Sequence, residues 1–189
     1  MAFLGTVRRG PALALAALLV LAAAAPAGLR AQTPEELEYQ VKAAFLYNFT
    51  KFVEWPAEAF ANERSPIVLC VAGEDRLGRS LEALVRGETV GGRSLVVDRA
   101  AGNYRACHLL FVGQSERERF SQVLDGVQGG DVLTVGEAPG FLEAGGLINF
   151  VMEKGKVRFA IHQAAAERSR LKISSKLMRL AINAREGAG

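Results

Sequence analysis

Residues 66–73, Pro-Ile-Val-Leu-Cys-Val-Ala-Gly, decide the fold of this chain. The six apolar residues 67–72 stand between a proline and a glycine, which is the pattern of a strand buried on both faces. A helix is expected soon afterwards, from about Gly78 to Val85. A buried strand followed by a helix indicates a βαβ unit, in which helices cover a parallel sheet.

The alternation of strands and helices continues along the chain. Short apolar runs predict further strands at 94–97, 107–112 and 131–135. Between the last two, Ser115 and Glu118 have the spacing of a capping box, which predicts a helix that extends to about residue 124. Strands that alternate with helices at this spacing favour a mainly parallel sheet.

The pattern changes near the C-terminus. Residues 147–153 and 156–162 alternate or run apolar around Lys154-Gly155, which predicts an antiparallel hairpin. A final helix is expected over residues 164–184. The predicted fold class is therefore α/β, a single three-layer domain with a mixed, mostly parallel sheet and a C-terminal β-hairpin plus helix.

A long helix is expected before the first strand. Residues 33–36, Thr-Pro-Glu-Glu, supply a cap residue, a proline at the first helical position and an early glutamate, and the helix should run to about residue 53. Its apolar residues form two sides: Leu37, Val41, Ala44, Phe45 and Phe52 on one, and Leu46, Phe49 and Val53 on the other. The helix therefore needs cover on several sides. The sheet and a neighbouring helix can provide it. The alternative to cover within the domain is a surface that binds a partner or forms a homodimer, with Phe45, Phe49 and Trp55 as candidate contact residues.

The first 31 residues have the pattern of a secretory signal peptide. Basic residues precede the apolar run 11–27, and small residues follow it. Cleavage is expected after Ala27, where Ala-Pro-Ala fits the preferred site, or after Ala31. The apolar run is shorter than the ~20 residues of a membrane-spanning helix, so export is favoured over a retained anchor.

Export changes the charge of the remaining domain, residues 32–189. The full chain has 23 basic and 20 acidic residues, and the basic Arg8, Arg9 and Arg30 precede Ala31. No acidic residue does, so the mature chain keeps 20 of each and has no net charge. The excess of basic over acidic residues in the full chain is thus no reason to expect a nucleic-acid partner.

Cys70 and Cys107 are the two cysteines of the chain. In an oxidising compartment, such a pair in a small exported domain is usually a disulfide, and two buried free thiols are the alternative. Two cysteines and two histidines at unrelated spacings are too few for a metal site. No metal and no other cofactor is expected.

One motif resembles a phosphate-binding loop. Residues 73–80 match G-x-x-x-x-G-[KR]-[ST]. Glu74 and Asp75 would repel phosphate, and Arg79 stands where the lysine is needed. The favoured interpretation is a turn whose glycines allow close packing, and a weak anion site at the helix N-terminus is the alternative.

Little else in the sequence has the pattern of an active site. Arg158 and His162 fall on one face of the last strand, where they would form either a ligand patch or a solvated sheet face. His108 is expected to be a buried, hydrogen-bonded imidazole. With two histidines and no G-x-S-x-G motif, the sequence predicts no catalytic residue, and the protein is expected not to be an enzyme.

Four segments carry a family resemblance. Residues 38–56, EYQVKAAFLYNFTKFVEWP, are long and unusual in composition. Together with LCV at 69–71, CHLLFV at 107–112 and LKISSKL at 171–177, they resemble the YfiR-like family of bacterial periplasmic proteins. The four segments span the mature domain from end to end.

The resemblance implies an exported, non-catalytic α/β protein in which Cys70 and Cys107 match the family's disulfide pair. In the system that names the family, the protein represses an inner-membrane diguanylate cyclase from the periplasmic side, and an outer-membrane lipoprotein relieves that repression. This chain has no second cysteine pair around residues 141–153, so control through a second disulfide is not expected. The alternative hypothesis is a periplasmic small-ligand-binding protein.

Overall fold

A computed structural model describes residues 32–74, 76–99 and 102–182. The expected signal peptide, residues 1–31, lies outside the described residues, so its cleavage after Ala27 or Ala31 stays a prediction. Within the described ranges, no helix has both the length and the apolar character that a bilayer crossing requires.

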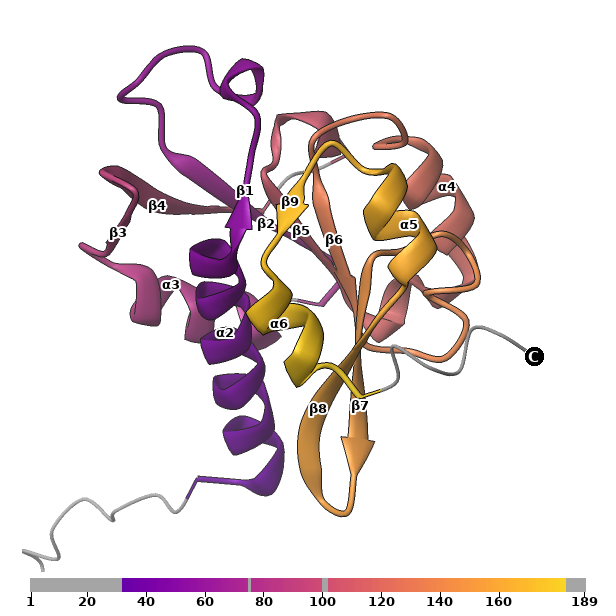
Figure 1. Cartoon of the computed structure of the whole chain (residues 1–189). Helices are drawn as coiled ribbons and strands as arrows, with labels where there is room; N and C mark the ends of the chain where they lie inside the picture. Colours follow the sequence, from indigo (N-terminus) through magenta and orange to yellow (C-terminus); the bar gives the residue numbers. More distant parts are fainter. Residues whose placement is uncertain (1–31, 75, 100–101, 183–189) are drawn as a thin grey trace, which may run out of the picture. The chain divides into compact units, whose positions relative to one another are not determined.

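A seven-stranded sheet organises the domain (Figure 1). Five central strands run parallel, and a strand at each edge is antiparallel to its neighbour. The spatial order is β3 (Thr89–Val90), β4 (Arg93–Asp98), β2 (Ile67–Ala72), β5 (Leu109–Val112), β6 (Leu133–Gly136), β7 (Ile148–Glu153) and β8 (Lys156–Ile161). The predicted mixed, mostly parallel sheet and the hairpin, β7–β8, are confirmed.

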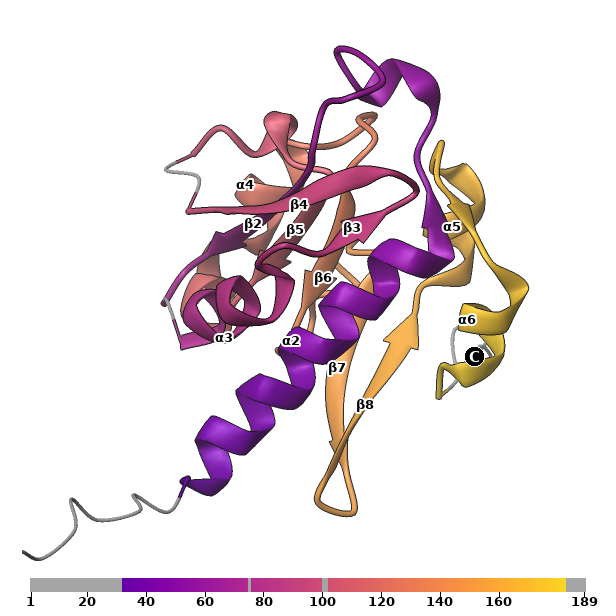
Figure 2. The same cartoon turned by 90° about the vertical axis from the view of Figure 1, so that its left-hand side faces the viewer.

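Helical layers cover the two faces of this sheet (Figure 2). Alternate side chains of a strand point to opposite faces, so neighbouring residues of β2 enter different cores. Leu69 packs in a core with α2 (Pro34–Phe52) and α3 (Arg76–Val85). Cys70 packs in a second core with α4 (Phe120–Asp125). This arrangement explains why β2 is apolar throughout, and it confirms the three-layer α/β class.

The structure shows which side of α2 is buried. Ala43, Leu46 and Phe49 are at most 1% exposed and face the sheet. The other predicted stripe turns outward, with Leu37 at 47% and Val41 at 43% exposure. The sheet therefore covers only one of the two apolar sides of this helix.

A cluster of phenylalanines joins α2 to the hairpin. The Phe49 ring lies 5.1 Å from Phe159 and 6.0 Å from Phe150, and Phe45 contacts the same two rings at 5.5 and 5.9 Å. Stacked, tilted and edge-to-face contacts at these spacings add to the free energy of burial. The prediction of Phe49 as a partner contact is wrong, because the sheet and hairpin bury its side chain completely.

The prediction of one final helix over 164–184 is also wrong. The chain forms α5 (Gln163–Arg168), β9 (Lys172–Ile173) and α6 (Ser175–Leu180) instead. β9 pairs with β1 (Val53–Glu54) in a separate two-stranded antiparallel sheet. The Ser174 side chain then accepts the Leu177 N–H and starts α6. A pairing with residues 120 positions away thus overrides the local helical pattern.

Smaller differences concern the segment that leads into α4, two further short turns and the start of β6. The expected helix from Ser115 begins instead as the 3₁₀ helix η3 (Gln114–Arg119), and the Ser115 hydroxyl accepts the Glu74 N–H rather than capping its own helix. Two more 3₁₀ turns are η1 (Ala57–Ala59) and η2 (Tyr104–Ala106). The strand expected from residue 131 begins at 133.

Cys70 and Cys107 form the expected disulfide, with their Cα atoms 5.8 Å apart. The bond links β2 to the residues that precede β5. The two cysteines are 37 positions apart in the sequence, and the bond closes the loop between them. In the chain-entropy account, such a loop stabilises the folded state by roughly 4 kcal/mol.

Replacing both cysteines, Cys70→Ala with Cys107→Ala, should lower the free energy of unfolding by about 2–5 kcal/mol, because the unfolded chain regains the freedom that the bond removes. Urea denaturation of the purified mature chain without reductant measures this loss. An unchanged urea midpoint, or free thiols in the unreduced wild type, would contradict it.

Candidate functional site

Exposed apolar side chains lie on the outward stripe of α2 and on the hairpin. Leu37, Val41 and Phe45 are spaced by four residues and therefore lie on one side of the helix. Phe45 contacts the hairpin, so this stripe continues from the hairpin toward the helix N-terminus. Met152, two residues beyond Phe150 on the same face of β7, is 53% exposed. We call Leu37, Val41 and Met152 the α2–hairpin surface.

Of the three predicted partner contacts, Phe45 belongs to the same stripe of α2, whereas Trp55 lies beyond the C-terminal end of α2, after β1. Phe45 and Trp55 are half-buried. The Trp55 indole N–H donates to the His108 carbonyl at 3.0 Å, which holds the ring against the sheet. Sequence reasoning recognised the stripe of Leu37 and Val41 as apolar but did not single it out, because periodicity alone cannot tell which apolar side a sheet will cover.

A second feature is a buried ion-pair network between α2 and the end of β6. Lys42 Nζ lies 2.5 Å from Glu38 Oε1 and 2.7 Å from Glu137 Oε2, and the Lys42 and Glu137 side chains are 7% and 6% exposed. The second Glu137 oxygen accepts the Gln114 N–H at 3.0 Å. Burial alone would lower the pKa of Lys42. Its bonds to Glu137 and Glu38 outweigh burial and raise that pKa, so the lysine stays charged.

This network forms the inner wall of a cleft at the carboxyl ends of the parallel strands. Two adjoining pockets, of about 270 and 330 Å³, share Glu35, Tyr39, Gln114 and Glu137 as lining residues. The chain leaves β2 toward one face of the sheet and β5 toward the other, so the cleft lies where the strand order reverses. Open α/β sheets bind their ligands at such positions. Burial is the main cause that raises the pKa of Tyr39, and the charge of Glu137 is the second. The hydroxyl therefore stays protonated.

The loop that resembled a phosphate-binding motif contributes to the same cleft. Gly73 has a φ of +98°, and a Cβ there would lie 2.5 Å from Ser115 Oγ. Arg76 pairs with Glu35 and with Glu74 at the cleft mouth. The close approach of Gly73 to Ser115 supports a packing role for this glycine, as the sequence analysis favoured.

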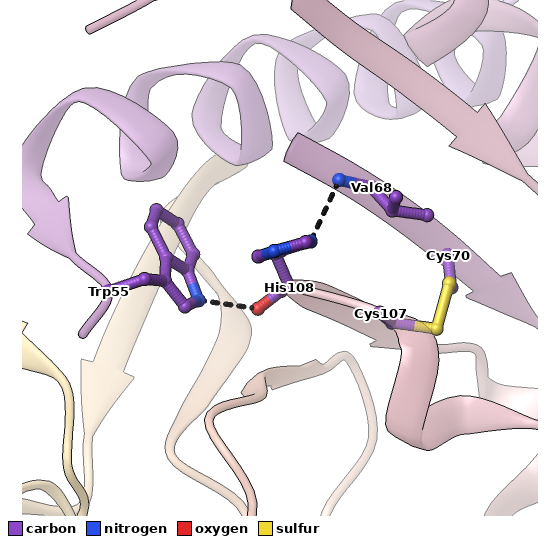
Figure 3. The surroundings of a disulfide bond; sticks show 5 residues. All are labelled: Trp55, Val68, Cys70, Cys107 and His108. Carbon is purple, nitrogen blue, oxygen red and sulfur yellow. Dashed lines mark hydrogen bonds between the residues drawn. A yellow bond between two sulfur atoms is a disulfide. The ribbon is translucent and has the colours of Figure 1, made fainter. Parts of the chain in front are cut away.

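His108 lies at the other end of the parallel strands, their amino-terminal end, beside the disulfide (Figure 3). Its Nδ1 accepts the Val68 N–H at 3.1 Å, and its Nε2 lies 3.1 Å from the Ala59 carbonyl oxygen. The Phe60 ring stacks on the imidazole with centroids 4.4 Å apart, and Trp55 packs edge-on. The prediction of a buried, hydrogen-bonded imidazole is confirmed.

The predicted ligand patch is divided between two environments. Arg158 is exposed and lies 3.5 Å from Glu153 across the hairpin. His162 lies just beyond β8, where its carbonyl accepts the first bond of α5, and its Nδ1 is buried without a hydrogen-bond partner in the described part of the chain. Four residues of extended chain separate them by about 13 Å. A shared ligand at Arg158 and His162 stays a prediction.

Within residues 32–182, apart from positions 75, 100 and 101, no group of three or more His, Cys, Asp and Glu side chains is arranged to hold a metal ion.

Comparison with known proteins identifies a family over most of the domain. The family model described as YfiR/HmsC-like matches residues 39–182. A comparison with curated proteins finds no match.

Replacing Lys42 tests the buried network. Lys42→Met should lower the free energy of unfolding by about 3–5 kcal/mol, because Glu137 would remain buried without its cation. The same change at the exposed Lys156 should alter it by less than about 0.5 kcal/mol. Urea unfolding of both variants measures the difference. Equal stability of the two variants would contradict a structural role for the network.

Proposed function

The chain belongs to the YfiR/HmsC-like family, and from this premise we propose that it is an exported, non-catalytic regulator that represses a membrane signalling protein. The partner that we favour is the periplasmic domain of an inner-membrane diguanylate cyclase, the partner in the system that names the family. The disulfide between Cys70 and Cys107 supports a periplasmic location, because such bonds persist in oxidising compartments.

The observation that carries the proposal is the α2–hairpin surface. Leu37, Val41 and Met152 are each more than 40% exposed on elements whose inner sides form the main core. Large apolar side chains that stay exposed beside a packed core are typical of surfaces that bind another protein. We therefore place the cyclase contact on this surface, with the half-buried Phe45 at its base.

A repressor of this kind works by preferring one state of its partner. If it binds the low-activity state of the cyclase more tightly than the active state, it shifts the population toward low activity without any chemistry of its own. An outer-membrane lipoprotein that binds the regulator would reduce its free concentration and so relieve the repression. A homodimer through the same apolar surface would compete with the cyclase.

Deleting the gene should raise cytoplasmic cyclic di-GMP and favour adhesion over swimming. A chain with Val41→Asp, expressed in the deletion strain, should leave cyclic di-GMP high, because a buried charge would be added to the contact. Val96→Asp is the matched control, since Val96 is 44% exposed on β4, outside the α2–hairpin surface. It should restore the wild-type level. Mass spectrometry of cell extracts measures the nucleotide.

Both variants must reach the periplasm in wild-type amounts, which immunoblots and urea unfolding check. An unchanged cyclic di-GMP level after deletion would exclude the cyclase as target. Equal repression by the two variants would exclude the α2–hairpin surface as the contact.

The cleft at the carboxyl ends of the strands favours a second candidate function, the binding of a small ligand. Its lining holds four glutamates, at positions 35, 38, 74 and 137, against the two cations Lys42 and Arg76. This balance favours a small organic amine, which could bind where the half-exposed pair of Arg76 with Glu74 opens.

Spermidine should raise the melting temperature of the mature chain in a saturable way, because it would bind only the folded state. Glutamate at the same concentration should not. Glu74→Gln should weaken the response to spermidine, and Glu153→Gln, a change at the hairpin, should leave it intact. A flat thermal response to spermidine would contradict the amine-binding alternative.

A further inference from the structure

We propose that His108 is a proton-sensitive latch, which holds the segment 55–65 against the amino-terminal edge of the sheet and releases it in mild acid. We call this segment the strap. It connects β1 to β2, contains the short turn η1, and has exposed residues along much of its length.

Two side chains of the sheet hold the strap in place. His108 contacts its first half: the ring bonds to the Ala59 carbonyl, stacks on Phe60, and the residue's own carbonyl accepts the Trp55 N–H. Arg93 holds the second half through bonds of 2.8 Å to the carbonyl oxygens of residues 62 and 65. The guanidinium also lies 3.7 Å from the Phe60 ring centroid, so His108 and Arg93 clamp this ring from both sides.

The hydrogen bonds fix the tautomer of the imidazole. Nδ1 accepts a backbone N–H from Val68, so Nδ1 carries no proton, and Nε2 must donate its proton to the Ala59 carbonyl. Protonation would place a second N–H on the ring, aimed at the N–H of Val68. The imidazolium therefore cannot keep the neutral ring's position between β2 and the strap.

Charges near the ring act in both directions. Burial is the main cause that lowers the pKa of His108. The bond to Ala59 raises it, Arg93 on β4 lowers it, and Asp131 before β6 raises it. Arg170 pairs with Asp131 at 3.4 Å and with Glu58 of the strap at 3.6 Å, and the first pair weakens the pull of Asp131 on a proton of the ring. The net effect favours the neutral ring.

The sign of the pH dependence follows from this lowered pKa. An opened strap returns His108 to water, where its pKa is about 6.5. Above that pH both states are neutral, and the latch keeps its full strength. As the pH falls below about 6.5 the open state takes up the proton first, so the equilibrium shifts toward opening.

The disulfide limits how far the opening can spread. Cys107 directly precedes His108 and is bonded to Cys70 in β2. The register of β2 and β5, with Leu69 opposite Leu109, is thus held covalently next to the latch. Loss of the His108 contacts would free the strap while the sheet stays paired, which makes the change a local switch rather than unfolding.

The strap continues through β1 into the C-terminal end of α2, so its release would loosen that end of the helix. The latch itself does not depend on the proposed cyclase partner, because its contacts lie within the chain. Its biological effect would be a pH-dependent affinity of α2 for whatever it binds.

Trp55 is the only tryptophan of the chain and lies in the strap, so its fluorescence reports the latch directly. Between pH 8 and pH 5, the oxidised mature chain should show a red shift of Trp55 emission and stronger quenching by acrylamide, with a midpoint below about 6.5. Far-UV circular dichroism should not change over this range. His162→Gln, which removes the only other histidine, should keep the transition.

His108→Gln should abolish the transition, because the amide side chain cannot take up a proton in this range. Flat wild-type fluorescence, an unchanged midpoint in His108→Gln, or loss of circular dichroism with the same midpoint would each overturn the latch. NMR of the wild type decides the case if His108→Gln does not fold. The His108 ring and the Trp55 indole N–H should titrate together, and titration of His108 without a Trp55 response would refute the proposal.

Discussion

The burial of one side of α2 against the sheet is the contact on which the other parts of this structure depend. Leu46 and Phe49 have no exposed surface, and the rings of Phe150 and Phe159 pack against Phe49. The same helix is held at its middle and at its C-terminal end. Lys42 bonds to Glu137 beyond β6, and the Phe52 carbonyl accepts the N–H of Ser174 from the C-terminal segment. Removing this helix would expose the main core along its length.

This constraint also explains the candidate surface. A helix that is apolar on two sides can satisfy only one of them with a single sheet, and the hairpin contacts Phe45 of the remaining stripe. Leu37 and Val41 are left outward at the N-terminal half. A domain that keeps such a stripe gains from a partner that covers it, which is the physical basis of the proposed regulation. The network around Lys42 fixes the helix, so the stripe is presented on a rigid support.

Sequence reasoning predicted the parts of this fold that local patterns determine. The apolar run of β2 predicted a strand that is buried on both faces, and helices cover both faces in the structure. Lys154-Gly155 predicted the hairpin turn, and φ is positive at both residues, as such a turn requires. It failed where distant segments decide. The 172–173 strand exists only because it pairs with Val53 and Glu54, and Phe49 is buried by strands about 100 residues away. The Lys42–Glu137 pair joins positions 95 residues apart and leaves no signal in the sequence.

Site-specific photo-crosslinking in the periplasm tests the central claim, that the outward stripe of α2 binds a membrane signalling protein. A photoreactive amino acid would replace Val41 in one strain and the equally exposed Val96 in another. We predict that Val41 yields a crosslink to the periplasmic domain of an inner-membrane signalling protein, a diguanylate cyclase in the favoured case, and that Val96 does not. No crosslink to such a protein from Val41, or the same crosslink from both positions, would contradict the account.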